Sequence, residues 1–172
     1  MFGLFKPKMA PEGPVQFVAE VDIAKPAEEV YRLVDWSDPG NAKVELGSSV
    51  TPVEGTKDRF LLSMPAVPEL SFELHVTEAD PGRCYSFGCE IEPQVGRFVS
   101  AHEEYHFEAV GEDSCKLTLV NTVNFIPGMT VKEMEQEIGT MGLASQNALI
   151  KLKVHAEMGA EAVKSIEAQQ FG

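Results

Sequence analysis

Basic residues are scarce in this sequence: 14 Lys and Arg stand against 27 Asp and Glu, which gives a formal net charge of −13. Nucleic-acid-binding proteins normally present a basic face to the phosphates, and anionic membrane surfaces attract basic segments, so this charge argues against both partners. No apolar run approaches the ~20 residues that a membrane-spanning helix needs. The first 14 residues contain no signal-peptide h-region. We therefore expect a cytoplasmic protein without stable membrane insertion.

Cysteine is also scarce, with three residues, Cys84, Cys89 and Cys115, and no CxxC pair. An odd number at these spacings is neither a disulfide framework nor a zinc ribbon. All three fall in segments with strand-like alternation, so we interpret them as small packing residues rather than nucleophiles. A glycine-rich phosphate loop is absent as well, and we expect no cofactor.

What the chain does contain is enough apolar material for a core. Its 172 residues, 44% of them apolar, fit one globular domain. Three prolines within residues 1–14 predict an extended lead-in. Strong periodicity then runs from about Val15 to Ala168, so we place a single domain at residues 15–168 and a short tail at residues 169–172.

The periodicity in the first three quarters of the domain is mainly that of strands. Alternating apolar residues predict a first strand over Val15–Ile23. Pro26 and Ser37-Asp38-Pro39 are then well placed to begin two short helices. Six further strands are predicted between Ser49 and Phe125. Two-residue alternation of this kind is typical of an antiparallel sheet with one covered face.

The last part of the domain is predicted to be one long helix. Thr130 and Glu133 form a capping box, which is a sequence signature of a helix N-terminus. Apolar and small residues then recur every three or four positions as far as Ile166. About 38 helical residues would span roughly 57 Å. Because this is long for such a domain, we expect a kink or break at Gly139 or Gly142.

This order of elements resembles the START/Bet v 1-like superfamily, also called SRPBCC or helix-grip proteins. The resemblance is carried by FVAEVDIAKPAEEVYRLV, by WSDPGNAK, by VTEADPGRCYSF and by the closing amphipathic helix. It implies an α+β helix-grip fold, in which a curved antiparallel sheet of about seven strands wraps around a long C-terminal helix, with two short helices after the first strand. Within the superfamily, the chain resembles the polyketide cyclase/dehydratase-like group.

The resemblance implies three hypotheses for function, because one fold supports many activities. The first is binding or transport of a small apolar molecule, such as a lipid, an isoprenoid or a polyketide-like compound, in an internal cavity. The second is a polyketide cyclase/dehydratase-type enzyme. The third is a co-chaperone-like protein-interaction module. The sequence leaves open whether the protein catalyses a reaction. It also leaves the oligomeric state open.

The segment His102-Glu103-Glu104-Tyr105-His106 matches the HExxH motif of zinc proteases. That chemistry needs a helix, on which both histidines meet one metal. Here the surrounding residues alternate with a period of two, and positions four apart on a strand are separated by about 13 Å, too far to share one zinc ion. We therefore expect no metal site, and we place both histidines on the outer face of a strand.

Glu103 stands out because it falls on the apolar face of its strand, between Ala101 and Tyr105. A carboxylate rarely occupies a core face without a partner. If Gly111-Glu112-Asp113 is a three-residue hairpin loop, Glu103 faces Asn121 on the next strand. Three roles stay open for the carboxylate: orienting a ligand hydroxyl or carbonyl, acting as a general acid/base with a raised pKa, or lying solvated at the open end of the sheet.

The candidate ligand-binding residues are the inward positions of the sheet and of the long helix, which combine apolar walls with a few polar groups, as small-molecule sites do. They are Phe72, Leu74, Tyr85, Phe87, Glu103, Tyr105, Asn121, Met134, Ile138, Met141, Ser145 and Leu149. In the enzyme hypothesis, Glu103 is the acid/base, assisted by Tyr85 or Tyr105. The simpler alternative is that most of these side chains form the core.

Overall fold

The computed structural model describes residues 6–170, with only the backbone of Gln170. Residues 1–5 of the predicted lead-in and residues 171–172 of the predicted tail lie outside the described residues. The elements follow the predicted order: β1 (Val15–Ile23), α1 (Ala27–Val34), α2 (Ala42–Glu45), β2 (Ser49–Pro52), β3 (Arg59–Ser63), β4 (Ser71–Asp80), β5 (Cys84–Glu92), β6 (Phe98–Gly111), β7 (Ser114–Phe125), α3 (Val131–Met158) and α4 (Ala160–Gln170).

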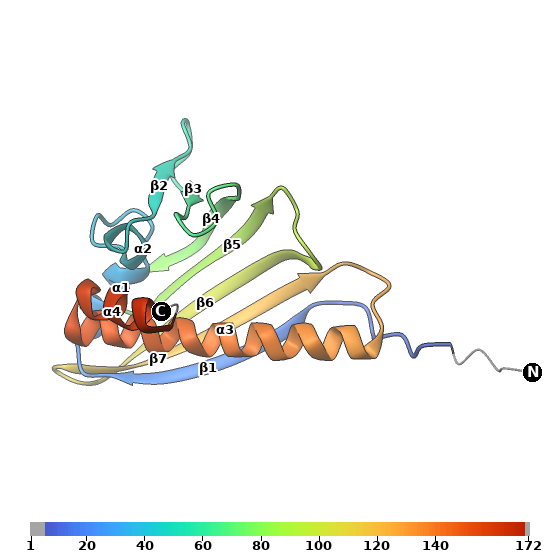
Figure 1. Ribbon diagram of the computed structural model, residues 1–172. Coiled ribbons are helices and arrows are strands. Elements are labelled where there is room, and N and C mark those ends of the chain that lie inside the picture. Colours follow the sequence, from blue (N-terminus) through green and yellow to red (C-terminus); the bar gives the residue numbers. More distant parts are fainter. Residues whose placement is uncertain (1–5, 171–172) are drawn as a thin grey trace, which may run out of the picture.

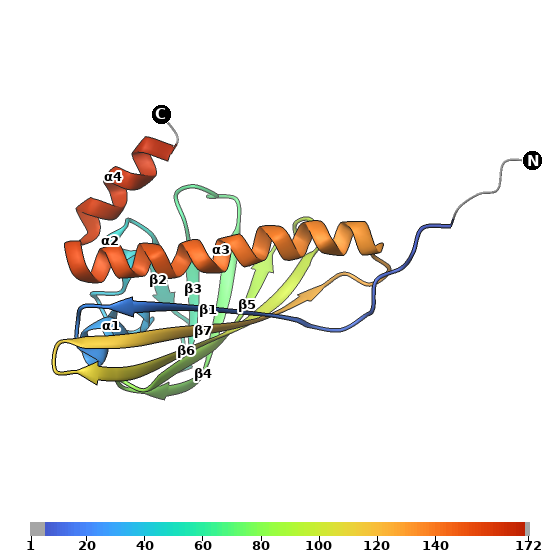
Figure 2. The ribbon, with the colours of Figure 1, turned by 90° about the horizontal axis from the view of Figure 1, so that it is seen from below.

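The seven strands form one sheet in the order β1-β7-β6-β5-β4-β3-β2, and every neighbouring pair is antiparallel. Helix α3 lies on the concave face and packs mainly against β1 (Figure 1). Strands β5 to β2 curl away from α3, while α1 and α2 lie near the C-terminal half of that helix (Figures 1 and 2). The α+β helix-grip architecture predicted from the sequence is therefore confirmed.

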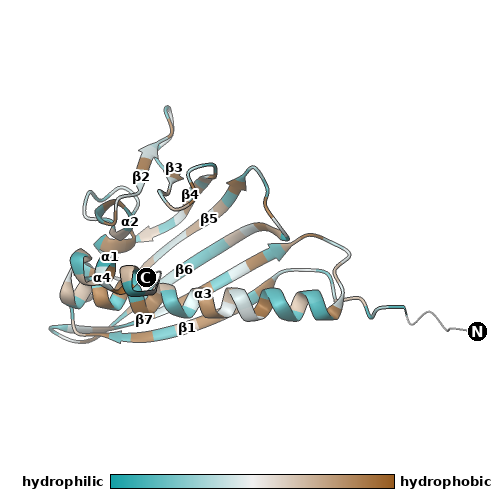
Figure 3. Ribbon diagram, in the orientation of Figure 1, coloured by the Kyte–Doolittle hydropathy of each residue, from teal (hydrophilic) through white to brown (hydrophobic). Residues whose placement is uncertain are grey.

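Alternation along the strands produces the two faces of the sheet, and the hydropathy colours change along each strand accordingly (Figure 3). β7 shows this most regularly, because Cys115, Leu117, Leu119, Asn121 and Val123 are buried and the residues between them are half-buried. The cross-strand register keeps such residues on one face, since a shift by one position would turn them outward. The core lies between this face and the helices.

The β6–β7 hairpin confirms the predicted register but corrects the predicted loop. Glu103 is paired with Asn121, as expected. The loop, however, contains only Glu112 and Asp113, because Gly111 is paired with Ser114. A register irregularity at Val110 absorbs the extra residue, which is what a β-bulge does. The bulge restores the agreement between the two apolar faces that a two-residue loop alone would break.

The long C-terminal helix is interrupted, but not where the sequence suggested. α3 is continuous through Gly139 and Gly142 and ends at Gly159, whose φ of 89° lies in the left-handed region. α4 then leaves in a different direction (Figure 2). At Gly142 a Cβ would lie 3.7 Å from the ring of Phe17 on β1, which is an ordinary van der Waals distance. An alanine would therefore fit between helix and strand at this position.

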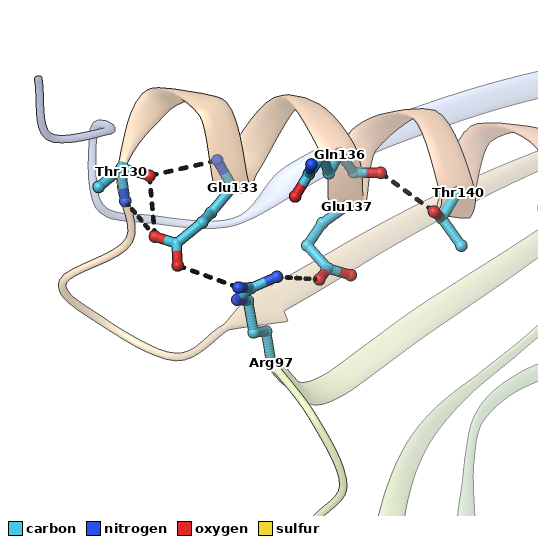
Figure 4. A network of polar contacts seen from close by, with 6 residues as sticks. All are labelled: Arg97, Thr130, Glu133, Gln136, Glu137 and Thr140. Atoms are coloured by element: carbon cyan, nitrogen blue, oxygen red, sulfur yellow. Dashed lines mark hydrogen bonds and ion pairs between the residues drawn. The ribbon is translucent and has the colours of Figure 1, made fainter. Parts of the chain in front are cut away.

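The start of α3 is fixed by the predicted capping box. Thr130 Oγ1 accepts from the backbone N–H of Glu133, and Glu133 Oε2 accepts from the backbone N–H of Thr130 at 2.9 Å. Arg97, in the β5–β6 connection, adds ion pairs to Glu133 at 3.0 Å and to Glu137 at 3.1 Å (Figure 4). These contacts tie the open end of the sheet to the first two turns of the helix.

None of the described helices is long and apolar enough to cross a bilayer.

Candidate functional site

A row of opposed residues crosses the middle of the concave face. Phe87 on β5 is paired with Glu103 on β6, Glu103 with Asn121 on β7, and Asn121 with Phe17 on β1. Tyr85, Tyr105 and Leu119 form the next row toward α1. The predicted polar pair is therefore surrounded by aromatic and aliphatic side chains on the face that α3 covers.

Glu103 has its hydrogen-bond partner on its own strand. Tyr105 donates its hydroxyl to Glu103 Oε2 at 2.8 Å, because residues two apart on a strand share a face. Burial raises the pKa of the Glu103 carboxyl, while the bond from Tyr105 and the charge of Lys43 act in the opposite direction. Burial and the neighbouring Glu103 raise the pKa of Tyr105 well above its ordinary value. The pair can hold or release a proton inside an apolar surrounding.

Asn121 is the second polar group of this row and lies under α3. Its Nδ2 lies 3.4 Å from Ser145 Oγ, a long contact, and both side chains are buried. Its Oδ1 is buried and has no partner among the described residues. Leu149, one turn further along α3, is completely buried. Here α3 closes tightly over the sheet.

A cavity of about 110 Å³ opens beside this row, between α1, α2, the C-terminal half of α3, α4 and strands β5 and β6. Its walls are largely apolar and aromatic with a few polar groups: Leu33, Val34, Trp36, Asn41, Ala42, Lys43, Leu46, Phe87, Tyr105, Ala148, Lys151, Leu152, His155 and Glu167. The rings of Trp36 and Phe87 meet edge to face, with centroids 5.2 Å apart. Tyr105 is part of the cavity wall, and its hydroxyl is hydrogen-bonded to the Glu103 carboxyl.

Of the twelve residues that the sequence suggested, Phe87 and Tyr105 line this cavity. Leu74 and Tyr85 are buried in the core behind it. Tyr85 has a positioning role there, since its hydroxyl accepts from the backbone N–H of Trp36 at 3.0 Å. Burial, and secondarily Asp35, raise the pKa of Tyr85. Phe72 is half-buried and packs against the edge of the same core.

The three predicted residues in the first turns of α3 lie away from the cavity. Met134 borders a separate hollow of about 230 Å³, formed with residues 10–13 and 125–129. Ile138 is 40% exposed. Met141 packs against a small cluster around Phe17 and Val123. The adaptable apolar wall predicted from these residues therefore belongs to the open end of the sheet.

Sequence reasoning missed the contribution of the loop after α1 and of the end of α3. Trp36 and Asn41 come from the WSDPGNAK segment, which carries the family resemblance and was expected to start a helix at Ser37-Asp38-Pro39, whereas α2 begins at Ala42 with Asn41 as its cap. Asn41 Oδ1 caps α2 by accepting from the Lys43 backbone N–H at 2.9 Å. His155 is buried and pairs with Glu45 on α2. The available signal in the sequence was the single tryptophan, Trp36, close to a helix cap. Nothing in the periodicity indicates that Trp36 and His155 border the same cavity.

The HExxH segment lies on β6, as expected. His102 Nε2 is hydrogen-bonded to Thr77 Oγ1 at 2.9 Å, and His106 Nε2 lies 3.4 Å from Glu104 Oε2, on the face opposite to Glu103. Within residues 6–170 there is no group of three or more His, Cys, Asp or Glu side chains arranged to hold a metal ion.

Solved structures with a similar fold are numerous. DynU16, a protein of the dynemicin biosynthetic locus, matches with a TM-score of 0.63 and 16% identity over 86% of this chain, which spans 49% of that protein. The Bet v 1-like protein Ara h 8.0201 matches with a TM-score of 0.62 and 12% identity, over 84% of this chain and 98% of that one. The Zhui aromatase/cyclase from Streptomyces sp. R1128 gives 0.57 and 14%, over 85% and 98%.

No family model and no curated protein sequence matches the chain. At identities this low, the structural similarities establish the fold and leave the activity to be argued from the site. The chain has the START/Bet v 1-like, or SRPBCC, fold that its sequence resembles.

Proposed function

We propose that this protein binds a small, largely apolar molecule in the cavity between α1, α2, α3 and the β5–β6 face. The observation that carries the proposal is the composition of the cavity wall: Trp36, Phe87, Leu152 and other apolar side chains surround a space of about 110 Å³ with few polar groups. Small-molecule sites have this composition, and burial of apolar surface supplies about 25 cal/mol per Å² before the costs of association. The ligand class is a lipid, isoprenoid or polyketide-like compound, or a part of one.

The experiment uses Trp36, which is the only tryptophan of the chain and lines the cavity. Titration with toluene should change its fluorescence in a saturable manner. Ala148→Phe adds a bulky ring at the exposed rim of the cavity and should weaken the change. Ala144→Phe is the matched control, because both alanines are exposed on α3 and only Ala148 borders the cavity. If toluene and longer apolar compounds give no saturable change, the binding proposal fails and the protein-interaction hypothesis gains.

The Glu103–Tyr105 pair favours a second candidate, an enzyme of the cyclase/dehydratase type. A carboxyl with a raised pKa, hydrogen-bonded to a tyrosine of the cavity wall, is suited to remove or return a proton next to a carbonyl group. The neighbour named an aromatase/cyclase is consistent with this chemistry on the same fold. It supports the candidate only by analogy, because the two chains share 14% identity.

A test of the second candidate is deuterium exchange at the methyl group of acetophenone, followed by NMR. The wild-type protein should accelerate the exchange, and Glu103→Gln should remove the acceleration, because an amide cannot serve as the base. Glu104→Gln is the control, since Glu104 lies on the opposite face of the same strand. Equal exchange in the presence and absence of the wild-type protein would leave a binding protein.

A further inference from the structure

The wall of the 110 Å³ cavity combines buried and exposed side chains. Its buried members include Trp36, Phe87, Tyr105 and Leu152. Lys43 on α2 borders the same cavity and is exposed to solvent. A ligand can therefore bury an apolar part among the aromatic and aliphatic side chains and keep its other end at the exposed rim.

The charged and titratable groups of the rim are paired with one exception. Lys151 Nζ lies 2.7 Å from Glu167 Oε1, and His155 is paired with Glu45. Lys43 forms no ion pair with any carboxylate of residues 6–170, and its ammonium has no hydrogen-bond partner among them. An ammonium carries a positive charge and three donors. The rim thus presents one cation whose partner is not supplied by the described residues.

The structure holds the backbone of Lys43 at this rim and leaves its side chain free. Asn41 Oδ1 accepts from the backbone N–H of Lys43 at 2.9 Å, as the N-cap of α2. Burial raises the pKa of the Glu103 carboxyl, and the charge of Lys43 acts against this increase. The positive charge of Lys43 is therefore felt at β6, where Tyr105 forms the cavity wall.

We propose that the cavity binds an apolar molecule that ends in a carboxylate, and that Lys43 binds this carboxylate at the rim. This inference rests on the proposed function and names the ligand class for the same cavity. Fatty acids and aryl-substituted carboxylic acids have this chemistry. Their apolar part would contact Trp36, Phe87 and Leu152, while their charged end stays in contact with water.

The charge balance favours a carboxylate over other anions. An ammonium and a carboxylate form charge-assisted hydrogen bonds and match each other's single charge. A phosphate monoester carries nearly two negative charges, and one lysine would leave it partly unpaired. The formal net charge of −13 repels anions from most of the surface, so recognition of an anion here needs a local cation.

The test compares carboxylates with uncharged amides of the same shape by titration calorimetry at neutral pH. The probes are phenylacetate, 3-phenylpropanoate and 4-phenylbutanoate, each beside its own amide. Lys43→Gln should lower the ratio of carboxylate affinity to amide affinity about three- to fivefold, which is what an exposed ion pair contributes. Lys57→Gln is the matched control, because Lys57 is exposed in the β2–β3 connection, outside the cavity wall. It changes the net charge equally and should leave the ratio unchanged.

The outcomes separate the two proposals. If the amides or toluene bind and the ratio is the same in Lys43→Gln and Lys57→Gln, the carboxylate site is refuted and the apolar binding function stands. The same holds if toluene binds and none of the carboxylates does. If no compound binds, both proposals fall. Lys43→Arg keeps the charge and should retain the ratio of the wild-type protein, and its loss in this variant would also overturn the inference.

Discussion

The hydroxyl of Tyr105 and Oε2 of Glu103 are 2.8 Å apart, on the same face of β6. Among the described residues, this bond is the one that a protein group donates to the Glu103 carboxyl. The raised pKa of Glu103 has burial as its main cause, so folding shifts the ionisation of this carboxyl toward the uncharged form.

This relationship predicts how stability depends on pH. Between the pKa of Glu103 in the unfolded chain and its higher pKa in the folded protein, folding takes up a proton, so the free energy of unfolding falls as pH rises through this window. Glu103→Gln removes the ionisation and keeps an acceptor for Tyr105. In urea denaturation, the variant should gain stability over wild type at pH 7 relative to pH 4. Glu112→Gln, in the β6–β7 turn, corrects for the change in net charge. A gain that is equal at both pH values would contradict the prediction.

A second prediction concerns the packing of α3 on the sheet. Leu149 is completely buried, whereas Leu143 on the same helix is 63% exposed. Leu149→Ala should lower the free energy of unfolding by about 2–5 kcal/mol, because the cavity it leaves relaxes only in part. Leu143→Ala should change it by less than about 0.5 kcal/mol. Similar losses from the two substitutions would show that the helix packs on the sheet in another orientation.

The capping box gives a third prediction with a control in the same helix (Figure 4). Thr130→Ala removes the side-chain acceptor for the Glu133 N–H and should cost about 1 kcal/mol in chemical denaturation. Thr140→Ala removes only a bond to the Gln136 carbonyl in the helix interior and should be neutral or slightly stabilising. The reverse order would mean that α3 begins elsewhere.

Gly139, within α3, and Gly159, between α3 and α4, give a fourth prediction. Gly159→Ala places a Cβ on a residue with φ of 89° and should destabilise the protein by about 1 kcal/mol or more. Gly139→Ala should stabilise it by about 0.5–1 kcal/mol, because, apart from the neighbouring residues and backbone of the same helix, no described atom lies within 4 Å of the added Cβ. Thermal unfolding of both variants measures the difference, and stabilisation by Gly159→Ala would rule out the break between α3 and α4.

The sequence was most informative where one local rule repeats. Alternation on β6 and β7, together with an assumed three-residue loop, predicted that Glu103 faces Asn121, because a shift by one residue would expose one apolar face. The length of the loop was not predictable in the same way, since the bulge at Val110 and the two-residue turn compensate each other. Likewise, periodicity continues across Gly159 although the backbone does not.

The candidate site was only partly predictable. Glu103 and Tyr105 could be found because a carboxylate interrupts an apolar strand face. Trp36 and His155 could not be joined from the sequence, because they come from a loop and a helix end that meet only after the sheet has curved. The size and position of the cavity depend on that curvature, which alternation does not encode.

The pairing of β1 with β7 has a consequence for synthesis of the protein. Val15 lies opposite Val123 and Ile23 opposite Cys115. The neighbouring strands β1 and β7 are therefore separated by most of the chain. A nascent chain leaving the ribosome carries the apolar face of β1, including Phe17, without its partner until β7 has emerged. Such distant pairing slows folding and leaves an open strand edge on which other chains can add. The first strand is therefore the strand that waits longest for its partner during synthesis.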